Sequence, residues 1–178
     1  VKANNGRLPI LAGVSDTSLD QAIAHAREAA SLGADAVFAI SPWYYTLDAA
    51  DIRSFFEQLA SASPLPLVIY HNPFNSKIPL DLDLIAALSE HDGIIGVKDS
   101  SCSMGFHLEL LARFGGREDF RVFQGDDGAM AAGTWHGAAG FVAATPVFAP
   151  ALAVNLYNAA RSGDPATMRS LQRKCTDL

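Results

Sequence analysis

Continuous apolar runs alternate along the chain with stretches whose apolar positions recur every three or four residues. The runs carry few polar interruptions, which predicts strands that are covered on both faces, and the second pattern predicts amphipathic helices. Six strands are predicted, at residues 8–14, 36–42, 66–73, 94–100, 119–125 and 139–145. Seven helices are predicted, at residues 19–33, 48–62, 80–91, 104–114, 127–136 and 149–163, with a closing helix that begins near Pro165.

Strict alternation of strands and helices predicts a parallel α/β fold, for which two architectures compete. An open doubly wound sheet that binds a dinucleotide is disfavoured, because no G-x-G-x-x-G follows the first strand. Polar groups at the ends of successive strands, namely Ser41, Tyr70, Lys98 and residues 124–126, favour a (β/α)8 TIM barrel instead. Such a barrel typically needs about 250 residues. We therefore expect residues 1–178 to form one partial barrel domain that covers strands 3 to 8 only.

Composition and charge narrow the class of protein further. Hydrophobic residues make up 49% of the chain, which is typical of a well-packed globular domain rather than a disordered one. The net charge is −6 and the basic residues are scattered, so a nucleic-acid partner is not expected. No apolar run is long enough to span a membrane, and the two cysteines lie far apart, which favours a reducing, cytoplasmic compartment. The chain opens without an initiator Met, so we expect a piece of a longer protein.

Lys98 is the candidate for catalytic chemistry. It is one of four lysines and the only one embedded in a strand-like run, IIGVKDS. Burial disfavours the charged ammonium and so lowers the pKa of a lysine. A neutral amine can attack a ketone and form an imine. The alternatives are an ion pair with Asp99 or Asp126, or a strand end that simply reaches solvent.

Three further stretches carry candidate groups. Tyr70 ends the strand before that of Lys98, where a phenol could transfer protons, although a core tyrosine is the alternative. The aromatic residues of SPWYYT, which include Tyr44 and Tyr45, could line a site, anchor an oligomer interface or cap the loop. In QGDDGAM, Gly125 allows close backbone approach, and the two carboxylates favour a helix cap over a metal site. The five histidines share no metal-ligand spacing, so no metal is expected.

Six segments together resemble a known superfamily. LPILAGVSDTS, GADAVFAISPWYY, LPLVIYHNP, IIGVKDSS, FQGDDGAM and GAAGFVAATP follow the order and spacing of the dihydrodipicolinate synthase/N-acetylneuraminate lyase superfamily. The most specific part is the pair of motifs that hold Tyr70 and Lys98. The resemblance implies a (β/α)8 barrel and a class I lyase that acts on pyruvate or a related 2-keto acid, without a cofactor.

The same resemblance implies roles for individual residues. Lys98 takes the Schiff-base position, and Tyr70 takes that of the tyrosine that transfers protons and contacts the keto acid. Tyr44 matches the aromatic residue that reaches into a neighbouring subunit's site in synthase-type members. Gly125 matches a glycine that lines the pocket, and Val142 an apolar residue whose backbone faces the pyruvyl group. A homo-oligomer, a dimer or a dimer-based tetramer, is therefore expected.

Two departures from the superfamily pattern bear on the reaction. The motif of the second strand, a glycine-rich turn with Thr or Ser followed by Gly-Glu, is absent from these residues. Asn75 occupies the position of an arginine that would clamp a second substrate carboxylate in synthase members. Aldolase or dehydratase activity on a hydroxylated 2-keto acid therefore fits better than dihydrodipicolinate synthesis. A truncated homologue that binds keto acids without catalysis is a further alternative.

Overall fold

A computed structural model describes residues 1–178, which divide into two compact units, Val1–Val97 and Lys98–Leu178. The chain forms six strands, as predicted, and the boundary between the units falls inside strand β4, Ile94–Asp99. No helix is both long and apolar enough to span a membrane.

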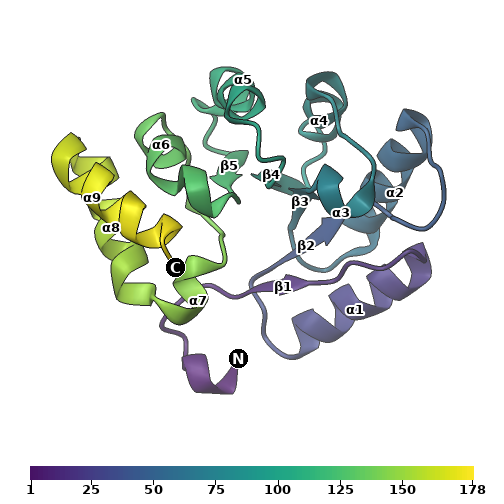
Figure 1. Ribbon diagram of the computed structural model, residues 1–178. Coiled ribbons are helices and arrows are strands. Elements are labelled where there is room, and N and C mark those ends of the chain that lie inside the picture. Colours follow the sequence, from purple (N-terminus) through teal and green to yellow (C-terminus); the bar gives the residue numbers. More distant parts are fainter. The chain divides into compact units, whose positions relative to one another are not determined.

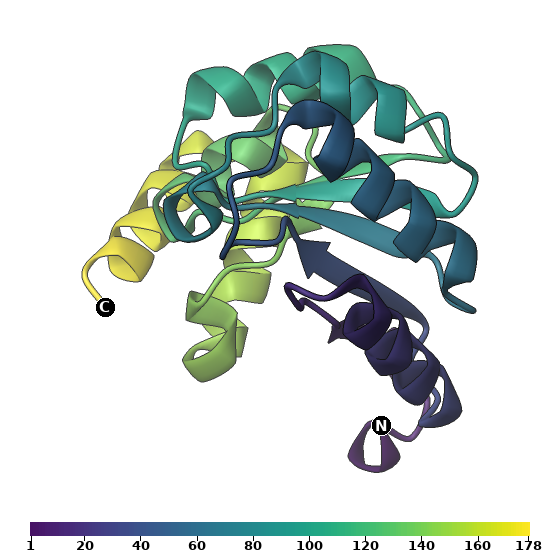
Figure 2. The same cartoon turned by 90° about the vertical axis from the view of Figure 1, so that its right-hand side faces the viewer.

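The first unit is a run of strand–helix pairs with parallel pairing. Its strands pair in chain order, with Ala12 opposite Val37 and Ile40 opposite Tyr70. Helix α2 packs against both α1 and α4, so the three helices lie side by side next to the strands (Figures 1 and 2). The elements are η1 (Lys2–Asn4), β1 (Leu11–Gly13), α1 (Leu19–Ser31), β2 (Ala36–Ile40), α2 (Ala49–Ala62), β3 (Leu67–His71), α3 (Pro73–Ser76) and α4 (Leu82–Leu88).

The core of this unit follows directly from the apolar runs. Val37 and Ala39 of β2 and Leu67 and Ile69 of β3 are fully buried on one face of the strands, and Ile40 and Val68 are buried on the other. Helix α2 contributes buried Phe56 and begins at a capping box formed by Asp48 and Asp51, which satisfies its free N–H groups. Burying one such large apolar side chain contributes about 1.5–3 kcal/mol relative to leaving it exposed.

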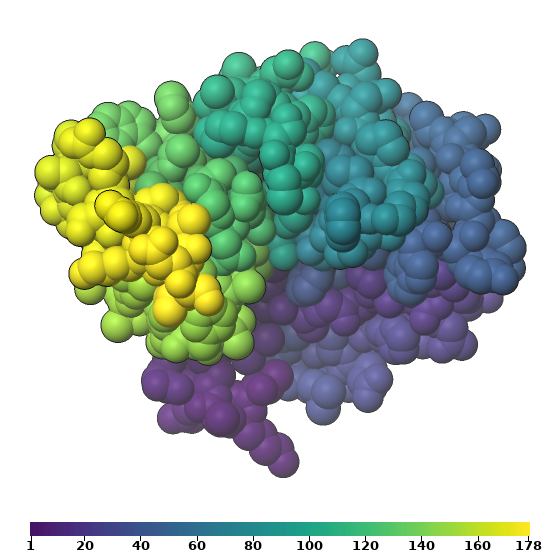
Figure 3. All heavy atoms as spheres, in the orientation of Figure 1, coloured from purple at the N-terminus to yellow at the C-terminus, as the bar shows by residue number.

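The second unit continues the same alternation. Strand β5 pairs with β6 in parallel, with Gln124 opposite Phe141. Helix α8 packs against α6 and α9 around a core that includes Met130, Leu156 and Met168, and α9 lies on the outside of this unit (Figure 3). Its elements are α5 (Met104–Phe114), β5 (Arg121–Gln124), η2 (Asp127–Ala129), α6 (Met130–Trp135), β6 (Gly140–Phe141), α7 (Thr145–Phe148), α8 (Pro150–Ser162) and α9 (Pro165–Thr176).

Several boundaries differ from the sequence prediction. The closing helix does begin at Pro165, but the short helices α3 and α7 were not predicted. The run at 139–145 forms only the two-residue strand β6, and Thr145 begins α7. The backbone N–H groups of Ala144 and Thr145 donate to the Asp127 carboxylate, so these groups bond to a side chain rather than to a neighbouring strand.

Candidate active site

Lys98 is the penultimate residue of β4 and is half-buried. The apolar residues before it, including Ile94 and Val97, are buried, which fixes the strand up to this point. Because side chains alternate along a strand, Lys98 and Ser100 share one face while Asp99 points to the other. The sequence predicted a lysine near the end of its strand, and the structure places Lys98 there with part of its side chain exposed.

Gly125 lies against the end of β4. Its N–H donates to the Asp99 carbonyl oxygen over 2.7 Å. A Cβ atom at position 125 would lie 2.8 Å from that oxygen and 3.0 Å from Lys98 Cε, and would collide with Ser100 Oγ. Only glycine fits this contact. The expected close backbone approach at Gly125 is therefore confirmed, and it occurs beside the candidate lysine.

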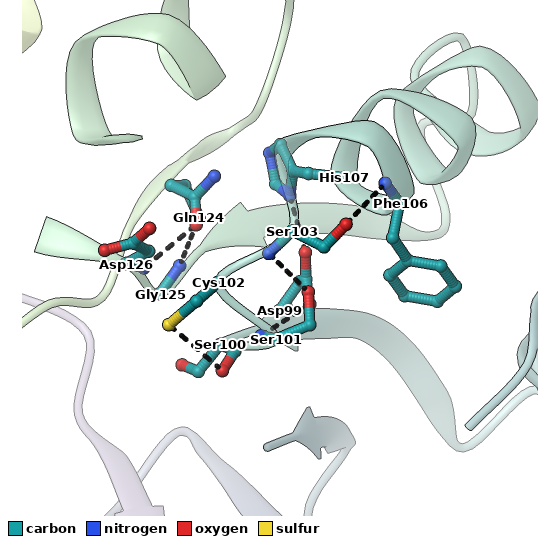
Figure 4. A network of polar contacts seen from close by, with 10 residues as sticks. All are labelled: Asp99, Ser100, Ser101, Cys102, Ser103, Phe106, His107, Gln124, Gly125 and Asp126. Atoms are coloured by element: carbon teal, nitrogen blue, oxygen red, sulfur yellow. Dashed lines mark hydrogen bonds and ion pairs between the residues drawn. The ribbon is translucent and has the colours of Figure 1, made fainter. Parts of the chain in front are cut away.

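Gln124 organises the end of β5 (Figure 4). Its side-chain oxygen accepts hydrogen bonds from the N–H groups of Gly125 (2.8 Å) and Asp126 (2.9 Å). Its backbone oxygen accepts from the Val142 N–H over 2.8 Å. The structure thereby brings Lys98, Gly125 and Val142 into one neighbourhood of the second unit.

A buried acid–imidazole pair follows Lys98 in the same unit (Figure 4). Asp99 Oδ2 lies 3.1 Å from Nδ1 of His107, and the two side chains are 2% and 0% exposed. The other carboxylate oxygen accepts from the Ser101 N–H over 3.0 Å. Sequence reasoning missed this pair. A signal was present, since His107 occupies the apolar face of α5 with Leu110 and Phe114, where a polar side chain needs a partner.

The two adjacent carboxylates after Gly125 both accept backbone hydrogen bonds, but only Asp126 forms the helix cap that the sequence predicted. Asp126 accepts from the Gly128 N–H and begins η2. Asp127 accepts from Thr145 N–H (2.6 Å) and Ala144 N–H (3.0 Å), which fastens the segment after β6 to η2. Burial alone would raise the pKa of Asp127, but the hydrogen bonds from Thr145 and Ala144 outweigh it and hold the pKa below its ordinary value.

Replacing Asp127 by asparagine should therefore lower stability at neutral pH by about 1 kcal/mol, the usual net value of such a hydrogen bond. A carboxylate whose pKa is lowered on folding stabilises the fold above its unfolded pKa and loses this contribution as the pH falls through the folded value. The difference in the free energy of unfolding between wild type and Asp127→Asn should shrink as the pH falls below about 4. Urea unfolding across pH 3–7 measures it, with Asp126→Asn as the matched control. Parallel wild-type and Asp127→Asn curves would contradict the prediction.

The remaining predicted residues lie in the first unit. Tyr70 is half-buried at the end of β3, and its ring meets the edge of Phe38 at 5.8 Å between centroids. Asn72 donates to the Tyr70 hydroxyl over 2.8 Å and accepts from the Asn75 N–H at the start of α3. Asn75 itself is exposed. Tyr44 is 77% exposed in the loop after β2, where it contacts only its neighbour Tyr45 among the aromatic rings described.

The sequence model of the dihydrodipicolinate synthetase family matches residues 1–178. The chain belongs to this family. The predicted resemblance is thereby confirmed, and so is the barrel class, since the six parallel strand–helix units match solved members of the family over nearly the whole chain. The chain spans little more than half the length of the curated relatives it matches, 54% to 58% for three of them.

Three proteins illustrate the similarity. The dihydrodipicolinate synthase of Bacteroides thetaiotaomicron is 34% identical, with a TM-score of 0.92 over 98% of this chain and 59% of its own. YagE of Escherichia coli K12, a prophage protein of the family solved in complex with pyruvate, is 28% identical, with a TM-score of 0.92 over 99% of this chain and 60% of its own. The probable 2-dehydro-3-deoxy-D-pentonate aldolase YjhH of E. coli K12 is 33% identical over 98% of this chain and 58% of its own.

Proposed function

We propose that the protein carrying these residues is a class I lyase in which Lys98 forms a Schiff base with pyruvate or a related 2-keto acid. The observation that carries the proposal is the placement of Lys98 at the end of β4. Gly125, which follows β5, packs so closely against this end that no side chain would fit at position 125. Side chains at the carboxyl ends of barrel strands form the active sites of this fold. Membership of the family and the pyruvate complex of YagE support the same substrate class.

The reaction follows from the chemistry of a primary amine. The neutral Lys98 amine attacks the C2 carbonyl, and the resulting carbinolamine loses water to give a protonated imine. In the cleavage direction, a proton acceptor takes the proton of the C4 hydroxyl, the C3–C4 bond breaks, its electron pair moves toward the imine nitrogen, and the other fragment leaves as an aldehyde. The enamine then takes up a proton at C3, and water releases pyruvate and the free lysine. No redox step or metal is needed in this sequence.

Two features favour an aldolase of hydroxylated 2-keto acids over a dihydrodipicolinate synthase. Asn75 supplies an amide where the synthase pattern has an arginine, so a bidentate clamp for a second carboxylate is lacking at this position. The relative YjhH carries the name of a pentonate aldolase. We also propose a homo-oligomer, which the exposed aromatic side chains of Trp43, Tyr44 and Tyr45 support as interface candidates.

Borohydride trapping tests the function directly. Protein is incubated with pyruvate and sodium borohydride, and the site of the reduced pyruvyl adduct is located by peptide mass mapping. An adduct on Lys98 supports the lyase, and product analysis then separates an aldolase, which releases pyruvate and an aldehyde, from a dehydratase, which releases water and one keto acid. Absence of any adduct on folded protein would instead favour a non-catalytic keto-acid-binding protein.

Tyr70→Phe tests the proton-transfer role. The substitution keeps the ring that meets Phe38 but removes the hydroxyl to which Asn72 donates. We expect turnover to fall by about 10²-fold, because a positioned acid–base group contributes that much or more. The Lys98 adduct should still form. Tyr157→Phe, which alters a half-buried tyrosine of α8, is the control. Unchanged turnover in Tyr70→Phe would assign Tyr70 to packing alone.

A further inference from the structure

The buried Asp99–His107 pair has no part in the proposed reaction, yet it is built into the segment that carries Lys98. Both side chains are almost completely buried, and Asp99 directly follows the lysine. A buried polar pair is seldom the most stabilising choice, since apolar side chains of similar volume often serve as well or better. Packing alone therefore does not explain why the Asp99–His107 pair lies next to Lys98.

Asp99 is held through both its side chain and its backbone. Its carboxylate accepts from the Ser101 N–H (3.0 Å) and faces His107 Nδ1 (3.1 Å), while its carbonyl oxygen accepts from the Gly125 N–H (2.7 Å). Lys98 precedes this anchored residue, and Ser100, which follows it, has its Oγ against Gly125. A rotation of the backbone at Asp99 would move the side chains of Lys98 and Ser100. The hydrogen bonds to Asp99 therefore fix the direction in which the Lys98 side chain leaves the strand.

His107 is itself held rigidly on α5. Its backbone N–H donates to the Ser103 oxygen, at the residue that caps the helix. The second ring nitrogen, Nε2, is buried without a hydrogen-bond partner, and a Cβ atom at Gly133 of α6 would lie 3.1 Å from it. An ionised carboxylate only accepts hydrogen bonds, so Nδ1 carries the proton that faces Asp99. Leaving Nε2 unpaired is costly, and a leucine would avoid that cost.

We propose that His107 is a positioning residue for Lys98, which acts by fixing the Asp99 carboxylate and with it the backbone of residues 98–100. The inference rests on the proposed Schiff-base function of Lys98. Displacing a reacting group by about 1 Å can cost on the order of 10²-fold in rate. His107 reaches the reaction only through Asp99 and contacts no reacting atom in this scheme.

Three substitutions of His107 separate its hydrogen bond to Asp99 from the rest of the side chain. His107→Asn places an amide N–H near the position of Nδ1 and can still donate to Asp99. His107→Gln carries its amide one carbon further, near Nε2, and His107→Leu removes the donor altogether. Leu110→Ala, which empties a fully buried position of the same helix, serves as the matched destabilising control. Thermal unfolding and circular dichroism establish the folded fraction of each variant.

The readout is the rate of pyruvyl adduct formation on Lys98 under borohydride, measured against pyruvate concentration. We expect His107→Gln and His107→Leu to lower the maximal rate by about tenfold or more and to change the half-saturating pyruvate concentration little. His107→Asn should stay within about threefold of wild type, and Leu110→Ala should lose stability without losing rate. If His107→Gln, folded, traps pyruvate at the wild-type rate, or if His107→Asn is as slow as His107→Gln, the inference is wrong. A wild-type protein that forms no adduct would instead overturn the proposed function.

Discussion

Replacing Lys98 by arginine is expected to abolish the pyruvyl adduct and to lower lyase turnover by at least about 10³-fold, the scale seen when a covalent nucleophile is removed. Arginine keeps the positive charge and much of the length of the side chain, but its guanidinium stays protonated and cannot add to a carbonyl. Lys98 is half-buried at the end of β4, so part of its side chain is exposed to solvent. Intact mass after borohydride treatment measures the adduct, and aldehyde release measures turnover.

Lys174→Arg is the matched control, because Lys174 lies exposed on α9. It should leave both the adduct and the turnover at wild-type levels. Lys98→Ala adds a second comparison that removes charge and length together. An adduct that persists in Lys98→Arg would place the nucleophile on another lysine, and full turnover in both Lys98 variants would exclude imine chemistry at this position.

Lys98 and Gly125 could be predicted because their local sequence is unusual. A lysine after Ile-Ile-Gly-Val interrupts a run that is otherwise suited to burial, and the glycine after β5 stands where a strand gives way to a helical turn. Both features are local, and the structure places both residues at strand ends, so close together that a Cβ atom at position 125 would lie 3.0 Å from Lys98 Cε. Strand and helix alternation was likewise predicted from periodicity alone, including the helix that begins at Pro165.

What sequence reasoning missed depends on contacts between segments that lie apart in the chain. His107 is eight residues beyond Asp99 and on a different element, and no local pattern pairs them. Strand β6 was predicted too long because Asp127, 17 residues before Ala144, takes the N–H groups that a longer strand would have used. Helix α3 was not predicted, because Pro73 was assigned to the end of a strand, although Asn72 before Pro73 is a favourable start for a helix.

The second large effect is expected when Gly125 is replaced, because any side chain at this position would crowd its neighbours. In Gly125→Ala, the new Cβ would lie 2.8 Å from the Asp99 carbonyl oxygen and 3.0 Å from Lys98 Cε, and would overlap Ser100 Oγ. The carbonyl belongs to the backbone and cannot move without shifting the residue next to Lys98. We expect adduct formation to slow by about tenfold to hundredfold. Overpacking of this kind should also lower the free energy of unfolding by about 1–3 kcal/mol.

Gly128→Ala is the control, since a Cβ there would lie 3.4 Å from its nearest neighbour, Asp126 Oδ1, at an ordinary contact distance. The double variant Gly125→Ala with Ser100→Ala relieves one of the three contacts and should recover part of the lost rate, because the hydroxyl no longer occupies the space of the new methyl group. The contact with the Asp99 carbonyl persists, so recovery should stay incomplete. If Gly125→Ala forms the Lys98 adduct as fast as wild type, close approach of the two strand ends is not a requirement of the chemistry, and Gly125 serves the fold alone.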